Sequence, residues 1–168
     1  MPSSSTDERG IQKTYSYDSD GAQTKVAYAD NTFETWCYND FKQVTRHRDR
    51  LGRVTRNSYD ARGNLLLKEV GLKDSATNGN SNDPYAESGY NRCAQDDVQT
   101  EEYATYQWEY YPAGNANQFL MSASIDANGN RTDYAYDANH RLISVTQPAD
   151  TAGGSRAVTQ LAYDSVGR

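Results

Sequence analysis

A tyrosine followed by aspartate or a polar residue returns along this chain at regular distances, each time at the end of a short alternating segment. The six tyrosines are Tyr17, Tyr38, Tyr59, Tyr110, Tyr136 and Tyr163. The first three are 21 residues apart, and the last three follow one another at 26 and 27 residues. Self-similarity at such a period indicates a repeat architecture, in which each unit is one supersecondary element. The fold must therefore be one that grows by adding copies.

Each unit carries turn signals on both sides of its tyrosine. An aspartate can bond the backbone two residues on, and a glycine three positions later accepts the positive φ that lets a type I turn rejoin a strand. After the tyrosine these signals are Asp18–Gly21, Asp60–Gly63, Asp164–Gly167, Asp137–His140, Gly114 alone, and Lys42 in the glycine position. Before it they are Asp7–Gly10, Asp49–Gly52 and Asp126–Gly129, with Asn31 in the same place before Tyr38.

The segments between turns are about seven residues long, a common strand length, and their side chains alternate across a sheet. Tyrosines two apart therefore share a face, and Trp36 shares one with Tyr38 as Trp108 does with Tyr110. The pattern predicts an all-β fold of tandem antiparallel hairpins whose aromatic face is buried or laddered. Each cross-strand pair contributes roughly 0.2–1 kcal/mol.

Composition limits the function more than the fold. Leu, Ile, Val and Phe make up only 22 residues, about 13% of the chain, a level typical of disorder, but the 14 ordered tyrosines argue against it. A formal net charge of -6 disfavours a nucleic-acid or anionic-membrane partner. The basic run Arg46 to Arg50, "RHRDR", is interpreted as a solvated turn. No apolar run is long enough for a membrane span, and "MPSSSTDERG" lacks the apolar core of a secretory signal.

Two segments, "DRLGRVTRNSYDARGNLL" at 49–66 and "DANGNRTDYAYDANHRLISV" at 126–145, resemble the YD repeat of the Rhs (rearrangement hotspot) family. The family pattern runs D-x-x-G-R-x-T-x-x-x-Y-D-x-x-G-R-L. The positions that match its threonine and final leucine are Thr55, Thr132, Leu65 and Leu142. Weaker copies are "YADNTFETWCYNDFKQVT" and "YYPAGNANQFL". The likeness covers about residues 7–70 and 105–168.

The resemblance implies a curved sheet that spirals into a hollow cocoon. Bacterial members enclose a C-terminal toxin or effector, released by self-cleavage at an aspartate-containing motif. Asp83-Pro84 does not match that motif, so we assign no catalytic residue. The expected role is a non-catalytic shell segment, truncated in its last unit, of an exported or cell-surface bacterial protein. Its partners would be neighbouring YD repeats of the same or another chain and an enclosed effector.

Four segments are expected: a disordered N-terminus at 1–6, repeats at 7–70, a polar insertion loop at 71–104, and repeats at 105–168. The insertion offers oxygen ligands of the kind that calcium takes, although it lacks the full EF-hand spacing. These candidates are Asp74, Asn78, Asn80, Asn82 and Asp83, but Asn/Asp-rich loops are usually only turns, so a solvated insertion without any cofactor is the main expectation. A disulfide between Cys37 and Cys93 would pin the insertion onto the sheet in an oxidising compartment, whereas both thiols would stay free in a cytosol.

No catalytic constellation is visible. His47 and His140 lie at or beside turns with no nucleophile placed next to them, and the recurring aspartates are best explained as turn caps. The main alternative to a shell segment is a carbohydrate-binding surface, in which exposed Trp36 and Trp108 would stack on sugar rings. Burial of the aromatic face separates the two hypotheses.

Overall fold

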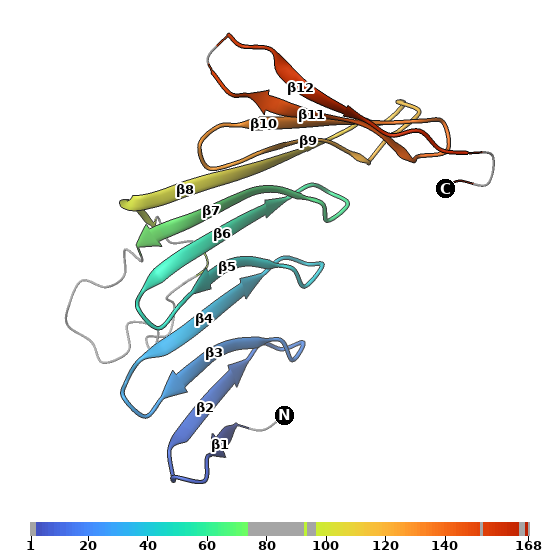
Figure 1. Ribbon diagram of the computed structural model, residues 1–168. Coiled ribbons are helices and arrows are strands. Elements are labelled where there is room, and N and C mark those ends of the chain that lie inside the picture. The colour runs from blue at the N-terminus through green and yellow to red at the C-terminus, as the bar shows by residue number, and fades with distance from the viewer. Residues whose placement is uncertain (1–2, 74–92, 94–96, 152, 165–166, 168) are drawn as a thin grey trace. The chain divides into compact units, whose positions relative to one another are not determined.

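The computed structural model describes residues 3–73, 93, 97–151, 153–164 and 167, and its elements are all β-strands (Figure 1). They are β1 (Ser4–Thr6), β2 (Gln12–Tyr17), β3 (Gln23–Tyr28), β4 (Phe33–Tyr38), β5 (Val44–Arg48), β6 (Arg53–Tyr59), β7 (Leu65–Lys73), β8 (Val98–Tyr110), β9 (Met121–Ile125), β10 (Arg131–Tyr136), β11 (Leu142–Ala149) and β12 (Arg156–Gln160). Neighbours in the sheet follow chain order. The all-β prediction is confirmed.

The chain divides into two units, each described here by itself. The first holds residues 1–64 and 68–104, and the second holds 65–67 and 105–168. Within both units the paired strands are antiparallel, as successive hairpins require. Threonine, valine and tyrosine recur in these strands, and such side chains favour the pleated backbone.

The hairpin turns have one hydrogen-bond pattern, shown here at Asp60. The N–H of Asp60 donates to the Asn64 carbonyl at 2.9 Å, and the Gly63 N–H donates back to the Asp60 carbonyl at 3.0 Å. The carboxylate oxygen Oδ1 of Asp60 accepts the N–H groups of Arg62 and Asn64 at 2.8 and 2.9 Å. The same pattern recurs at Asp7, Asp18, Asp49, Asp126 and Asp137. The predicted aspartate turns are confirmed at these six positions, whereas Gly114 lies in a longer loop that is closed by the Phe119 N–H donating to the Tyr111 carbonyl at 2.9 Å.

The turn position three residues after the aspartate is left-handed even where it is not glycine. Gly63 has φ 87°, and Lys42 and His140, which replace glycine, both have φ 61°. Asn31 has φ 63° in the turn before Tyr38. In that turn Tyr28 takes the aspartate's position, and the carboxylate that caps Thr32 comes from Asp30. Hairpin register therefore overrides residue preference at these positions.

Four tyrosine hydroxyls each connect a hairpin to the preceding one. The acceptor is the backbone carbonyl of the sixth residue after the preceding repeat tyrosine. The bonds are Tyr38 to Gln23 (2.7 Å), Tyr59 to Val44 (2.9 Å), Tyr110 to Leu65 (3.1 Å) and Tyr163 to Leu142 (2.7 Å). Each bond lies within one unit. The recurring tyrosine is thus a spacer between hairpins as well as a packing residue.

Burial in the first unit is greatest on the face opposite the aromatic stripe. In β4, Phe33, Thr35 and Cys37 are buried, whereas Trp36 and Tyr38 are half-buried on the other face. The sequence predicted an aromatic face that is either buried or laddered. In the structure this face is laddered by hydroxyl hydrogen bonds and is only half-buried. Tyr38 and Tyr59 bond backbone carbonyls of the preceding hairpin through their hydroxyls, and both side chains remain half-buried.

Two expected boundaries are wrong. Ser4–Thr6, placed in a disordered N-terminus, form β1 because their backbone pairs with that of Gln12 to Thr14. The insertion is shorter than 71–104, because β7 continues to Lys73 and β8 begins at Val98. Paired backbone stabilises these ends although their side chains are polar. The calcium candidates from Asp74 to Asp83 lie outside the described residues.

Candidate functional site

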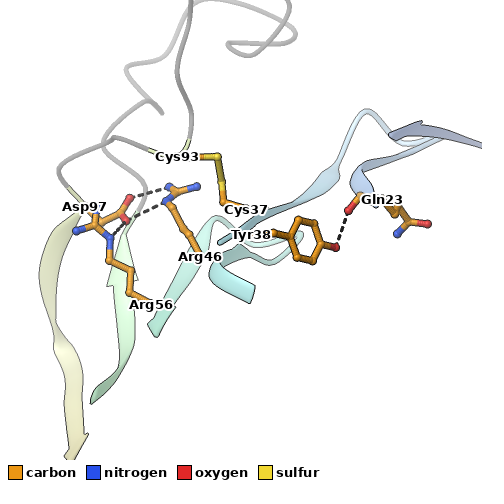
Figure 2. Close-up of a disulfide and its surroundings, with 7 residues drawn as sticks. All are labelled: Gln23, Cys37, Tyr38, Arg46, Arg56, Cys93 and Asp97. Atoms are coloured by element: carbon orange, nitrogen blue, oxygen red, sulfur yellow. Dashed lines mark hydrogen bonds and ion pairs between the residues drawn. A yellow bond between two sulfur atoms is a disulfide. The ribbon is translucent and has the colours of Figure 1, made fainter. Parts of the chain in front are cut away.

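The candidate site of the first unit is the point where Cys93 and Asp97 attach to the sheet (Figure 2). A disulfide joins Cys37 of β4 to Cys93, 56 residues later, with their Cα atoms 5.7 Å apart. A cross-link across a loop of this length stabilises a fold by about 4 kcal/mol in the chain-entropy account. Cys37 is only 3% exposed, so the bond ends on the buried face of β4.

A buried ion pair lies beside the disulfide. Asp97 has no exposed side-chain surface, and its two carboxylate oxygens accept hydrogen bonds from Arg46 Nη2 at 2.7 Å and Arg46 Nε at 3.0 Å. Arg56 Nε also donates to Oδ2, at 2.7 Å. The bidentate fork from Arg46 and the second arginine give this carboxylate a nearly complete set of charged donors.

Register places these groups in one row. Cys37 is the cross-strand partner of Arg46, and Arg46 is that of Arg56. Directly opposed residues of antiparallel strands point to the same face. The disulfide and the ion pair are therefore adjacent attachments on one face of β4, β5 and β6. Figure 2 shows Tyr38 pointing away from them, toward Gln23.

The interpretation of "RHRDR" as a solvated turn is wrong for its first three residues, which belong to β5. Arg46 is 2% exposed and Arg48 is 6% exposed. Arg48 Nη1 donates to the Phe33 carbonyl at 2.9 Å, and its guanidinium lies 4.1 Å above the Phe33 ring. Burial is tolerable because the Arg46 guanidinium meets the Asp97 carboxylate, and the Arg48 guanidinium meets carbonyl acceptors and an aromatic face. Arg50 does lie in the turn, where it pairs with Asp30 at 2.6 Å.

Charges in the second unit form an exposed ladder on the face opposite its tryptophan. Glu109 and Arg131 form an ion pair at 2.7 Å, and Asp133 pairs with both Arg131 and Arg156. The carboxylates of Glu109 and Asp133 raise the pKa of Arg131. Ala123 of β9 is the cross-strand partner of Glu109 and Asp133, and its small side chain leaves space for the pairs. These side chains are about one third to one half exposed.

The histidines are bonded within the repeat scaffold. His47 stacks on Trp36 with ring centroids 5.0 Å apart, and its Nε2 lies 3.4 Å from Glu34 Oε2. His140 Nδ1 lies 3.3 Å from the Asn117 side-chain oxygen. Among the described residues, no group of three or more His, Cys, Asp or Glu side chains could hold a metal ion.

The turn aspartates behave as ionised caps. The pKa values of Asp18, Asp60, Asp126 and Asp137 lie below the usual 3.8 because hydrogen bonds favour the charged form. The largest causes are the Ala22 N–H for Asp18, the Asn64 side chain for Asp60, the Asn130 side chain for Asp126 and the Arg141 N–H for Asp137. Each of these four hydrogen-bond partners belongs to the same turn as its aspartate.

The two tryptophans proposed for sugar stacking are both half-buried. Trp36 also lines a hollow of about 520 Å³ together with Tyr38, Lys42 and the carboxylates of Asp18, Asp20 and Asp40. Lys42 Nζ lies 2.5 Å from Asp20 and 3.6 Å from Asp18, which neutralises much of that charge. Both tryptophans are candidates for one carbohydrate-binding surface, but each belongs to a different unit.

Repeated hairpins, shared turn chemistry and a tyrosine hydroxyl ladder define a β-repeat protein, because four of the six repeat tyrosines bond the hairpin that precedes their own. The family model described as "RHS Repeat" matches residues 38–75 and 114–152. These two segments are RHS repeats, and the resemblance found in the sequence is confirmed. No curated protein sequence matches the chain.

Solved structures show the same fold. A crystal structure of TcdB2-TccC3 without its hypervariable C-terminal region aligns with a TM-score of 0.64 at 19% identity. A TcdB2-TccC3-Cdc42 structure and a Photorhabdus luminescens Tc holotoxin pore with a TccC3 mutation each align at 0.64 and 20%. Each alignment covers 99% of this chain and 8% of the other. In the described part, no helix has the length and apolar character needed to cross a bilayer.

Proposed function

We propose that this chain is a non-catalytic structural segment of an RHS-repeat shell. The observation that carries the proposal is the tyrosine ladder, in which four of the six repeat tyrosines each reach a carbonyl of the preceding hairpin. These hydrogen bonds join parts of the protein to each other and carry out no reaction. It fixes the spacing of consecutive hairpins, which is what a wall built from repeats needs.

An open edge supports the same proposal. β12 is the last strand in the sheet order, and all five of its residues are exposed. Val158 is 54% exposed on this strand, and Leu161 just beyond it is 38% exposed. Unpaired edge strands with apolar side chains favour pairing with another strand. Neighbouring repeats, of the same or another chain, are the natural occupants.

In the full-length protein, the proposed shell encloses an effector and is exported. Support for this comes from the family resemblance and from the likeness to TcdB2-TccC3, of whose length this chain spans 8%. The proposal needs no cofactor. A shell segment should bind equally well to its neighbours with calcium or with a chelator present.

A glycan array tests the proposal against the carbohydrate-binding alternative. The shell hypothesis predicts no saturable binding to any glycan by the purified chain, with calcium or with a chelator. Saturable binding that Trp108→Ala abolishes and Tyr106→Phe preserves would overturn it. Tyr106 is the matched control because it lies on the same strand and the same face as Trp108.

A further inference from the structure

Two different bonds hold Cys93 and Asp97 on one face of the first unit. Cys93 is joined covalently to β4, and Asp97 is held by guanidinium groups of β5 and β6. Their anchors, Cys37, Arg46 and Arg56, follow one another as cross-strand partners. Figure 2 shows the disulfide next to the Arg46 guanidinium. The two attachments are close enough to depend on each other.

The ion pair alone is a weak attachment. Burying a carboxylate and a guanidinium costs much of the Coulomb energy that their pairing returns, so a buried pair contributes little net stability. Asp97 is also 51 residues from Arg46 in sequence, so forming the pair closes a long loop at an entropic cost. The disulfide keeps the carboxylate at high effective concentration beside the arginines. Removing the cross-link therefore weakens the ion pair.

The disulfide is open to attack from one side. Cys93 is exposed, whereas Cys37 is 3% exposed. A thiolate therefore attacks Cys93 Sγ, the S–S bond breaks, and Cys37 leaves as a thiolate that takes up a proton. The second thiol of a dithiol reductant then displaces Cys93 as a thiol and closes the reductant's own disulfide. Two electrons pass from the dithiol to the protein.

We propose that Cys37, Cys93, Asp97 and Arg46 form a redox-controlled latch. In an oxidising compartment the disulfide holds Asp97 on the arginines and keeps the Arg46 guanidinium out of water. A dithiol reductant releases Asp97 and exposes Arg46. The hairpins persist, because the turns and the tyrosine hydroxyl bonds of β3 to β6 do not involve either cysteine side chain.

Arginine modification by phenylglyoxal, mapped by peptide mass spectrometry, tests the latch in the full chain. Modification of Arg46 should be slow in the oxidised protein and faster by about tenfold or more after treatment with dithiothreitol. Arg50, whose side chain is 43% exposed and pairs with Asp30 instead of Asp97, is the internal control and should change little. Cys93→Ser should show fast modification of Arg46 without any reductant.

Circular dichroism and intact mass accompany the labelling. The expected result is complete reduction with the β-sheet signal retained. Protection of Arg46 after complete reduction, or in Cys93→Ser, would show that the ion pair holds without the disulfide and would overturn the latch. Loss of the sheet signal on reduction would also overturn it, because the cross-link would then support the whole unit.

Discussion

The phenolic hydroxyl of Tyr38 donates a hydrogen bond to the backbone carbonyl of Gln23 at 2.7 Å. Because the acceptor is backbone, any residue can stand at the acceptor position. This explains how the repeats differ widely in sequence while the tyrosine recurs. The hydroxyl is half-buried with its ring, and burial raises the pKa of Tyr38, so it stays protonated and can donate throughout the neutral range.

Tyr59→Phe should lower the free energy of unfolding by roughly 0.5–1.5 kcal/mol, the net value of one hydrogen bond, because the ring stays and only the bond to Val44 is lost. Urea denaturation followed by circular dichroism measures the change. Tyr136→Phe is the matched control. Its hydroxyl has no hydrogen-bond partner among the described residues, and its edge contact with Tyr111 does not need the oxygen. Equal effects of the two substitutions would contradict the ladder.

Left-handed turn positions give a pair of substitutions with opposite signs in the second unit. Gly129→Ala should destabilise by roughly 1–2 kcal/mol, because φ is 79° and the space around the added Cβ is open, so backbone strain alone acts. His140→Gly should stabilise by up to about 1 kcal/mol, because it relieves the same strain at φ 61°. Thermal unfolding of both variants measures whether the midpoint temperature falls for Gly129→Ala and rises for His140→Gly. A destabilised His140→Gly would show that the contact with Asn117 outweighs the strain.

Asp97→Ala should destabilise the first unit by roughly 3–5 kcal/mol, because it leaves the Arg46 charge buried without its carboxylate. Asp20→Ala removes a carboxylate from the ion pair with Lys42, which is exposed on both sides, and should change the unfolding midpoint very little. Chemical denaturation of the oxidised proteins compares them. Similar small effects would mean that Arg46 is hydrated in solution.

Acid should destabilise the hairpins through their turn caps. The pKa of Asp60 and of Asp126 is lowered in the folded state, first by the side chains of Asn64 and Asn130 respectively. A depressed pKa means that the stabilisation is fully present above the unfolded value near 3.8 and is lost as pH falls through the folded pKa below it. The urea midpoint should thus be flat near neutrality and fall below about pH 4. Asp60→Asn should reduce that fall, and an unchanged pH profile would count against the caps.

Local chemistry made the hairpins predictable from sequence. Asp60 and Gly63 define a turn by themselves, and Tyr15 and Tyr17 reveal the alternation of a strand. Lys42 could be placed at a left-handed position only by repeat register, since lysine has no such preference. Tyrosine burial was harder to predict, because alternation shows that Trp36 and Tyr38 share a face but not which face is covered.

The attachment of Asp97 could not be predicted in this way. Its partners Arg46 and Arg56 are 51 and 41 residues away, and no periodicity links them. One local signal existed. Arg46 and Arg48 are two residues apart, as side chains on one face of a strand are, and that spacing is compatible with a strand as well as with a solvated turn. The presence of two cysteines suggested the pairing of Cys37 with Cys93. Sequence alone did not decide whether they pair, because the redox state of the compartment was unknown.

Association of the isolated chain tests the central claim most directly. Sedimentation velocity over a concentration series should show concentration-dependent association, or unfolding at low denaturant, because β12 presents an unpaired exposed edge. Val158→Lys, which places a charge on that edge, should weaken association without changing the circular dichroism spectrum. A chain that stays a stable monomer at every concentration, and that binds a defined sugar, would contradict the account of a shell segment.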